Sequence, residues 1–468
     1  MNVGREKKSY NRDKNRQNIA FLVSILVCLL VCIIGSSNAV MDLITLLCYF
    51  LVIFVIYLSA PELLLKYLHF WIMSSWAVLA VYVLENGNID LRGNHSEHFG
   101  SLPIYVFSWI IFYLCICTME MRKKKKKIET VDLLEKGQAE YVSNNVMRLA
   151  YVSFFLLLLC FLSICYKPYF ALGVDRFVYK SSQLSGFVST LSPWFYCLIP
   201  VVLMTRNRNK KLSVAYLTLL SLFCIWQGEK FSGLLRIIFY SMIAVSPEYA
   251  GVVIKKNLNK LVKIASIIML LLLVIVIIQQ IVLYQADLDI LLNYFENRLA
   301  AQGELWWLTY KGDAAKGMHF NEIWDEISVW IHQPTGAMSD YNFGIYKLMK
   351  KFMNPNWVSY TLALGIRATE ATRASLFYYG KWPALIIGQM LLGLLVYYTI
   401  NSCTEYCNKH NWFFAILYLY ILQGVISAAY MMDIQLLTTK RMILVYIILL
   451  ISKNRTIKIG DRVIVSDS

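Results

Sequence analysis

The segment VMDLITLLCYFLVIFVIYL, residues 40–58, carries a single charged side chain, Asp42, in a long apolar run. A helix needs about 20 such residues to cross the hydrocarbon core of a bilayer. Similar runs recur along the chain, and a sliding hydropathy reading predicts about twelve spans. The expected spans are residues 18–36, 40–58, 66–84, 102–121, 147–166, 187–205, 212–227, 231–253, 263–284, 380–401, 412–431 and 435–452. The sequence therefore predicts an all-α, polytopic integral membrane protein.

Composition supports this class. Of the 468 residues, 58% are hydrophobic and only 16% are charged, whereas about a quarter of a soluble domain is charged. The net charge of +16 falls in short blocks between the apolar runs. A nucleic-acid-binding protein would instead present a continuous basic patch, so we expect no nucleic-acid partner. The 11 cysteines lie in apolar runs or in loops expected inside, which indicates no disulfide framework.

The basic blocks also predict the orientation. They occupy the N-terminal tail, residues 122–127, 206–211 and 255–260, and the C-terminal tail. If the spans alternate, all these segments lie on one side, and short loops rich in Lys and Arg stay in the cytoplasm. We expect both termini in the cytoplasm of a bacterial inner membrane. The first span is too long for a cleavable signal peptide, so we expect it to be retained.

Three regions follow from this plan. Residues 1–284 would form spans one to nine, 285–379 a large periplasmic loop, and 380–468 spans ten to twelve with a cytoplasmic tail. The loop is far longer than a connection needs to be, and it is rich in tryptophan. Disordered segments are poor in aromatic residues, so we expect the loop to fold over the outer mouth of the bundle.

Two charged clusters open and close this loop. In the segment 294–307, a helix would place Arg298 and Gln302 on one face, with Glu304 close by. In the segment 366–375, Arg367, Glu370 and Arg373 recur every three residues and would form one stripe. Arginine is the preferred partner of phosphate oxygens because its planar guanidinium donates two parallel hydrogen bonds. The same residues also fit interfacial helices with surface ion pairs, and the sequence leaves both interpretations open.

Two further cations lie in outer connections, Arg176 and Lys230, the latter within Gly228-Glu-Lys-Phe-Ser-Gly233. His319 and His332 lie in the large loop without the spacing of a metal site. Cys403 and Cys407 likewise lack partners for a metal. The chain contains no phosphate-binding loop of the G-x-x-x-x-G-K-[ST] type. We expect neither a metal nor a nucleotide cofactor.

The layout resembles the O-antigen polymerases, the Wzy-type polymerases of oligosaccharide repeat units. The shared features are about twelve spans, cytoplasmic termini, a large late periplasmic loop rich in Arg and aromatic residues, and the segment 228–233. An R-x10-G pattern of some members is not matched, because Arg176 and Gly186 are one residue too close and Arg367 and Gly380 two too far apart.

The resemblance implies a membrane glycosyltransferase that moves a growing glycan from undecaprenyl diphosphate to the sugar of another lipid-linked repeat unit. Membrane lipid and a chain-length regulator protein would be its partners. Cationic donors must neutralise the departing diphosphate, and a base must accept the proton of the acceptor hydroxyl. The charged residues of the outer loops are the candidates for these two roles. The expected diphosphate ligands are Arg298, Arg367, Arg373, Arg176 and Lys230, and the expected bases are Glu304 and Glu370.

Three alternatives remain. An O-antigen ligase would pass the glycan to a lipid A core, and ligase-like proteins place a histidine among the arginines of the large loop, as His319 or His332 would be. A flippase for lipid-linked oligosaccharides suits twelve spans but does not explain a folded outer loop. A polyprenyl-phosphate-sugar glycosyltransferase needs an acidic motif in the first outer loop, where only Asp42 is near.

Overall fold

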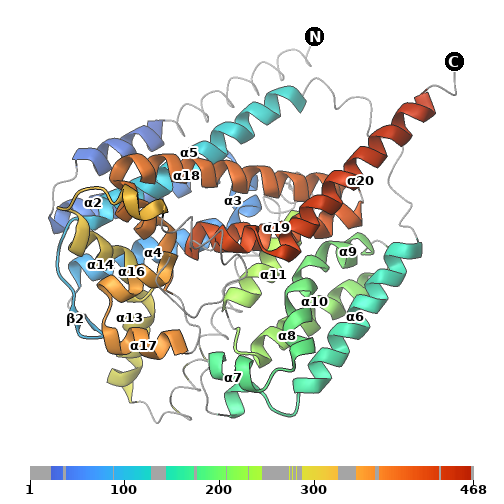
Figure 1. Ribbon diagram of the computed structural model, residues 1–468, viewed down its shortest axis with the longest axis horizontal. Helices are drawn as coiled ribbons and strands as arrows, with labels where there is room; N and C mark the ends of the chain where they lie inside the picture. The colour runs from blue at the N-terminus through green and yellow to red at the C-terminus, as the bar shows by residue number, and fades with distance from the viewer. Residues whose placement is uncertain are drawn as a thin grey trace.

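The protein is a bundle of α-helices, shown in Figure 1 as a computed structural model. It describes residues 23–34, 38–87, 89–127, 144–172, 176–206, 208–229, 231–244, 287–324, 344–363, 368–409, 411–431 and 434–464, with single positions at 274, 277 and 281. The only sheet among these residues is a two-stranded antiparallel hairpin, β1 (Asp90–Leu91) and β2 (Asn94–His95).

The helices divide into three consecutive groups. The first is Val23–Ile34, α2 (Ala39–Ser59), α3 (Pro61–Lys66), α4 (Leu68–Asn86), α5 (Ser101–Lys127) and α6 (Asn144–Ile164). The second is η2 (Tyr169–Ala171), α7 (Arg176–Ser182), α8 (Gly186–Cys197), α9 (Ile199–Met204), α10 (Lys210–Trp226) and α11 (Phe231–Ala244). The third is α13 (Leu288–Ala300), α14 (Glu304–Asp313), α16 (Gly344–Phe352), α17 (Pro355–Ala363), α18 (Ala371–Asn408), α19 (Trp412–Met431), η4 (Ile434–Leu437) and α20 (Lys440–Ile464).

Six helices of the described chain are long and apolar enough to cross a membrane: α2, α4, α5, α6, α18 and α19. They match six of the predicted spans and confirm a multi-pass membrane protein. The predicted span 187–205 is divided between α8 and α9, with Pro200 near the start of α9. The helices α10 and α11 are shorter, with 17 and 14 residues. The predicted span 263–284 lies outside the described residues, apart from single positions.

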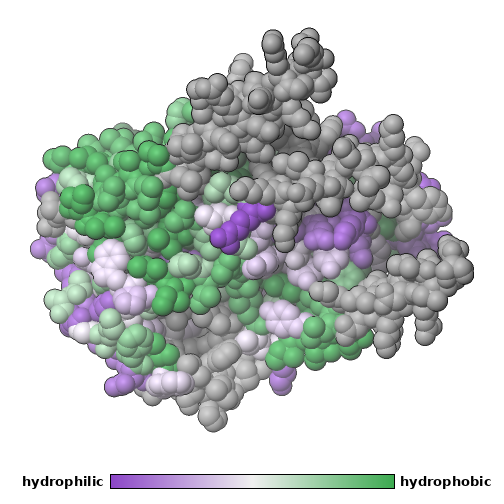
Figure 2. All heavy atoms as spheres, turned by 90° about the horizontal axis from the view of Figure 1, so that it is seen from above, coloured by the Kyte–Doolittle hydropathy of each residue, from purple (hydrophilic) through white to green (hydrophobic). Residues whose placement is uncertain are grey.

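The outer surface of these helices suits lipid. Figure 2 shows a broad hydrophobic area on one face of the molecule. Large apolar side chains are exposed on α2 (Val40, Leu43, Leu47, Leu51, Phe54 and Leu58) and on α18 (Ile387, Met390 and Leu391). A soluble monomer rarely exposes a contiguous apolar patch of this kind, so we assign these faces to the bilayer.

The segment between α11 and α18 contains four helices in the part that is described. The helices α13, α14, α16 and α17 lie together on one side of the bundle (Figure 1). Helix α16 is amphipathic, because its residues Ile345, Leu348 and Met349 are buried while Lys350 and Lys351 are exposed. These apolar residues join Leu305 and Trp307 of α14 in a second hydrophobic core, separate from that of the bundle.

A buried ion pair links three helices of the bundle. Lys66 of α3 pairs with Glu120 of α5, and both side chains are less than a tenth exposed. Lys66 also donates to Asn401 Oδ1 of α18 at 2.8 Å, and Tyr67 donates to Glu120 at 2.7 Å. A buried charge is tolerated only when it is paired and hydrogen-bonded, and this network meets both conditions.

Glu120→Ala should therefore leave the Lys66 ammonium buried without its counter-ion and lower the free energy of unfolding by about 3–5 kcal/mol. Glu405→Ala in the same bundle is the control, because the ion pair that Glu405 makes with Lys409 is at the surface and both side chains are more than half exposed. It should cost less than about 0.5 kcal/mol. Reversible unfolding of the detergent-solubilised protein measures both values, and equal losses would contradict the assigned role of the buried pair.

Candidate functional site

The large loop and the start of α18 bring together a cluster of ionisable side chains, which we call the loop cluster. Its members are Asp313, His319, Glu322, Lys347, Lys351, Tyr378 and Lys381. They come from α14, α16, α18 and the segment that follows α14. The cluster joins acids, cations and an imidazole, as sites for proton transfer and anion binding do.

A proline in α18 explains how His319 reaches this site. Pro383 has no N–H, so the carbonyl of Tyr379 cannot accept the usual hydrogen bond from the residue four positions later. The backbone N–H of His319 donates to that carbonyl instead, at 3.0 Å. The imidazole ring of His319 then stacks on Tyr378, with centroids 4.3 Å apart and planes at 11°.

The kink in α18 also positions Lys381. Gly380 and Lys381 have non-helical backbone angles, and Lys381 has a φ of 50°, in the left-handed region that residues with a Cβ seldom adopt. A Cβ on Gly380 would lie 2.5 Å from the Cβ of Ala384, so only glycine fits there. Strained backbone of this kind is often found at functional sites. Here it directs the Lys381 ammonium to the side chain and the carbonyl of Asp313.

Asp313 orients the histidine. Its carboxylate is fully buried, and its Oδ1 lies 3.0 Å from Nε2 of His319. A carboxylate hydrogen-bonded to one imidazole nitrogen favours the tautomer that keeps the proton there. The lone pair is then on Nδ1. A carboxylate oxygen of Glu322 lies 3.3 Å from this nitrogen, so an acceptor hydroxyl can bind to Nδ1 only after that carboxylate has moved aside. His319 therefore has the geometry of a general base held by a buried acid.

Two lysines of α16 complete the cluster. Lys347 pairs with Glu322 at 2.7 Å, and Lys351 donates to the hydroxyl of Tyr378, which donates in turn to Glu322. Burial opposes ionisation of Glu322, but the hydrogen bonds from Lys347 and Tyr378 outweigh it and lower the pKa of the carboxyl group. The acid is thus ionised at neutral pH, and the lysines form a cationic rim around the histidine.

Of the predicted bases, Glu304 lies at the opposite end of α14 from Asp313. It is buried and pairs with Arg92, whose guanidinium stacks on Trp357 at 3.5 Å. Arg92 and Gly93 form the turn of the hairpin with φ of 57° and 81°, which suits a two-residue hairpin turn. Burial raises the pKa of Glu304 to about 7, against the opposing charge of Arg92. Its titration near neutrality fits a base, but the contact with Arg92 keeps it apart from the loop cluster.

The predicted stripe of charges before span ten forms in part. Arg373 donates to Glu370 at 2.8 Å, but Glu370 precedes the helix with a φ of 59°, and both side chains are buried rather than on an exposed helix face. Arg373 also donates to Gln389 at 3.0 Å and stacks on Trp109 at 3.2 Å. A diphosphate would reach this guanidinium only after displacing these partners. Arg367 lies outside the described residues.

The remaining predicted residues are dispersed. Arg298 is exposed on α13 and donates to Tyr294 at 3.3 Å; the helix ends at Ala300, so Gln302 lies beyond it. Arg176 is the first residue of α7, and Lys230 and His332 lie outside the described residues.

Next to Lys230, the carboxyl group of Glu229 pairs with Lys180 and accepts a hydrogen bond from Tyr196. Burial opposes ionisation of Glu229, but Lys180 and Arg236 outweigh it and lower its pKa to about 2.

Most of the loop cluster was not singled out from the sequence. Its members span residues 313–381 and come together only through tertiary contacts. Two local signals pointed to it: the pair Lys347 and Lys351 at helical spacing, and Gly380-Lys-Trp-Pro383, where a glycine and a proline flank a lysine within an apolar span.

The chain matches no model of a protein family, and neither curated proteins nor solved structures gave a match.

The raised pKa of Glu304 predicts a pH dependence of stability. An acid with a raised pKa in the folded state stabilises it fully below its ordinary pKa of 4.5, and this contribution is lost as the pH rises through about 7. Glu304→Gln should flatten the fall in melting temperature between pH 5 and 8. Glu97→Gln is the control, because Glu97 is 63% exposed. A wild-type pH profile in the Glu304→Gln protein would show that Glu304 is already ionised throughout this range.

Proposed function

We propose that the protein transfers a glycan from a lipid-diphosphate donor to a sugar hydroxyl at the outer face of the membrane, and that it polymerises lipid-linked oligosaccharide repeat units. The observation that carries the proposal is the pairing of buried Asp313 with His319 beside Lys347, Lys351 and Lys381. The resemblance in layout to the O-antigen polymerases narrows the donor to undecaprenyl diphosphate and the product to O-antigen or a similar surface polysaccharide.

The chemistry has two needs that the loop cluster can meet. The bond between the anomeric carbon and the diphosphate oxygen breaks, and the acceptor oxygen forms the new glycosidic bond. The acceptor proton passes to Nδ1 of His319, while Asp313 stabilises the imidazolium that forms. This assigns the base to His319 in place of Glu304 or Glu370, both of which are held in buried pairs with arginine.

The leaving diphosphate needs cations. Three lysines in the cluster outnumber the two carboxylates, Asp313 and Glu322, which leaves a surplus of positive charge beside the histidine. Preorganised cations aimed at a developing charge are usually the largest contribution to such catalysis. Lysine binds phosphate as a point charge, so these ammonium groups can replace the arginines that the sequence suggested. Arg298, exposed on the same loop, remains a further candidate for the donor.

An O-antigen ligase is the second candidate, because a histidine within the cationic part of the large loop is a feature of ligase-like proteins. The two activities differ in the acceptor, a lipid-linked repeat unit or a lipid A core. Gene deletion followed by lipopolysaccharide gel analysis separates them. Collapse of the ladder to core plus one repeat unit indicates a polymerase, and long chains retained on the carrier indicate a ligase. Single units trapped on the cytoplasmic leaflet would indicate a flippase and contradict both.

His319→Ala should reduce chain growth by about 10²–10⁴-fold, the usual contribution of a general base. The measurement is polymer formed by the purified protein from undecaprenyl-diphosphate-linked repeat units. Lys316→Ala is the control, because Lys316 is an exposed residue of the same segment and not a member of the cluster. If His319→Ala polymerises at the wild-type rate, the loop cluster is not the catalytic site.

The proposal includes twelve spans, cytoplasmic termini, an inner-membrane location and a periplasmic large loop. Lys350 of α16 and Arg208, before α10, should then lie on opposite sides of the membrane. In spheroplasts, a membrane-impermeant maleimide should label Lys350→Cys but label Arg208→Cys only after disruption, since basic short loops remain in the cytoplasm. The protein without either substitution is the control for labelling of the native cysteines, which are all buried or half-buried. The reverse labelling pattern would place the loop cluster in the cytoplasm.

A further inference from the structure

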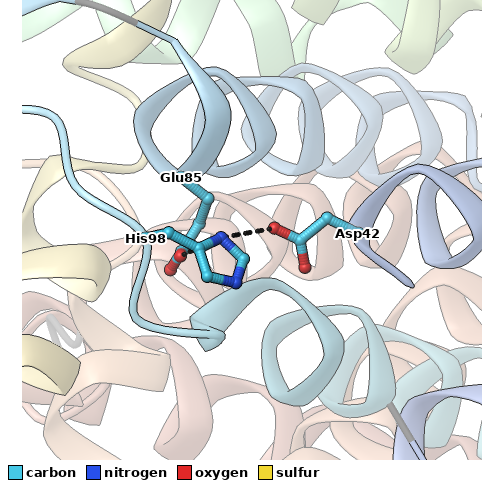
Figure 3. A group of neighbouring side chains, drawn as sticks. All are labelled: Asp42, Glu85 and His98. Carbon is cyan, nitrogen blue, oxygen red and sulfur yellow. Dashed lines mark ion pairs between the residues drawn. The ribbon is translucent and has the colours of Figure 1, made fainter. Parts of the chain in front are cut away.

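Two carboxylates and a histidine converge beneath α14, outside the loop cluster. They are Asp42 in the first turn of α2, Glu85 at the end of α4, and His98 in the connection before α5. Figure 3 shows the three side chains pointing toward one another from these three elements. The side chains of Asp42 and Glu85 are fully buried, and that of His98 is 26% exposed.

The distances in this group do not fit a simple ion pair. Nδ1 of His98 lies 3.4 Å from Oδ2 of Asp42 and 3.4 Å from Oε2 of Glu85. A charge-assisted hydrogen bond from an imidazolium would be about 2.7–2.9 Å long. Within the described structure neither ring nitrogen of His98 has a hydrogen-bond partner, although both are buried. Oδ1 of Asp42 is likewise buried without a partner.

The same distances fit a metal ion. Ligand atoms about 2.1 Å from a tetrahedral Zn²⁺ stand roughly 3.4 Å from one another. One imidazole and two carboxylates also balance the charge of a divalent cation, whereas two buried carboxylates without one would repel each other. We propose that Asp42, Glu85 and His98 bind one divalent transition-metal ion, such as Zn²⁺ or Mn²⁺.

Surrounding hydrogen bonds hold the carboxylates in place, as in metal sites whose ligands are oriented by outer partners. Asn86 Nδ2 donates to Oδ2 of Asp42 at 2.8 Å. Glu85 accepts three bonds at the start of α5: its Oε2 from the N–H groups of Phe99 and Gly100 at 2.6 and 2.9 Å, and its Oε1 from that of Ser101 at 2.8 Å.

The site has a structural consequence for α14. Trp307 donates its indole N–H to the carbonyl of Glu97 at 3.1 Å, and Trp306 donates to that of Ser101 at 3.4 Å. Glu97 directly precedes His98, and Ser101 is the first residue of α5, so the ion would fix both acceptors to α2 and α4 through His98. A metal bound here would therefore hold the surface on which α14 rests, independently of what the loop cluster does.

The test is metal binding by the purified, full-length protein in nanodiscs, without a histidine tag and stripped with a chelator that is then removed. Equilibrium dialysis with Zn²⁺ or Mn²⁺ should give about one equivalent per chain and a rise in melting temperature. His98→Ala and Asp42→Asn should weaken binding at least tenfold. His95→Ala is the matched control, because His95 is an exposed histidine of the same outer connection and should bind as the wild type does.

Absence of stoichiometric binding of either metal to the wild type, or wild-type binding by both His98→Ala and Asp42→Asn, would overturn the proposal. If the variants fail to fold, X-ray absorption of the zinc-loaded wild type decides. Nitrogen or oxygen ligands at about 2.0–2.2 Å, with the outer-shell scattering of one imidazole, support the site. A sulfur ligand at about 2.3 Å would place the ion on the cysteines and refute it.

Discussion

The missing N–H of Pro383 is the constraint on which the arrangement of the loop cluster depends. It releases the carbonyl of Tyr379, and a released backbone acceptor near a membrane must find a donor because unsatisfied groups are costly there. The donor is the backbone of His319. The same break lets Gly380 and Lys381 leave the helical path, so that one interruption of α18 places both a histidine and a lysine against Asp313.

Helix α14 connects the separate parts of this outer structure. At its first residue, Glu304 pairs with Arg92 of the hairpin, and at its last, Asp313 holds His319 and Lys381. Between them, Trp307 donates to a carbonyl of the connection that precedes α5, and Trp306 donates to the carbonyl of the first residue of α5. Glycine at position 312 allows the ring of Phe352 on α16 to approach closely, since a Cβ there would lie 2.7 Å from it. A displacement of α14 would therefore disturb both the loop cluster and the group formed by Asp42, Glu85 and His98.

Charged side chains within the apolar bundle differ in burial from those of the loop cluster. Arg373 with Glu370 and Lys66 with Glu120 are almost fully buried, and each pair is surrounded by further polar partners. Such pairs are costly to break and contribute mainly to the arrangement of helices. In the loop cluster, Lys347 is 23% exposed and Lys351 is exposed, whereas Lys381 is 11% exposed and held against Asp313. Burial therefore separates Arg373 and Lys66, which hold helices together, from Lys347 and Lys351, which remain accessible to solvent.

The sequence by itself determined the class of protein and the positions of its main spans, because hydropathy over about 20 residues is a local property. It also placed Glu370 and Arg373 close together, although Glu370 precedes α18 with a positive φ and is not part of a helical stripe. Tertiary structure alone decided that this pair is buried, and that Asp313, His319 and Lys381 meet. It likewise brought Asp42, Glu85 and His98 from three elements to one point. Such contacts depend on how helices pack and where one of them is interrupted, and neither is encoded in the spacing of residues along the chain.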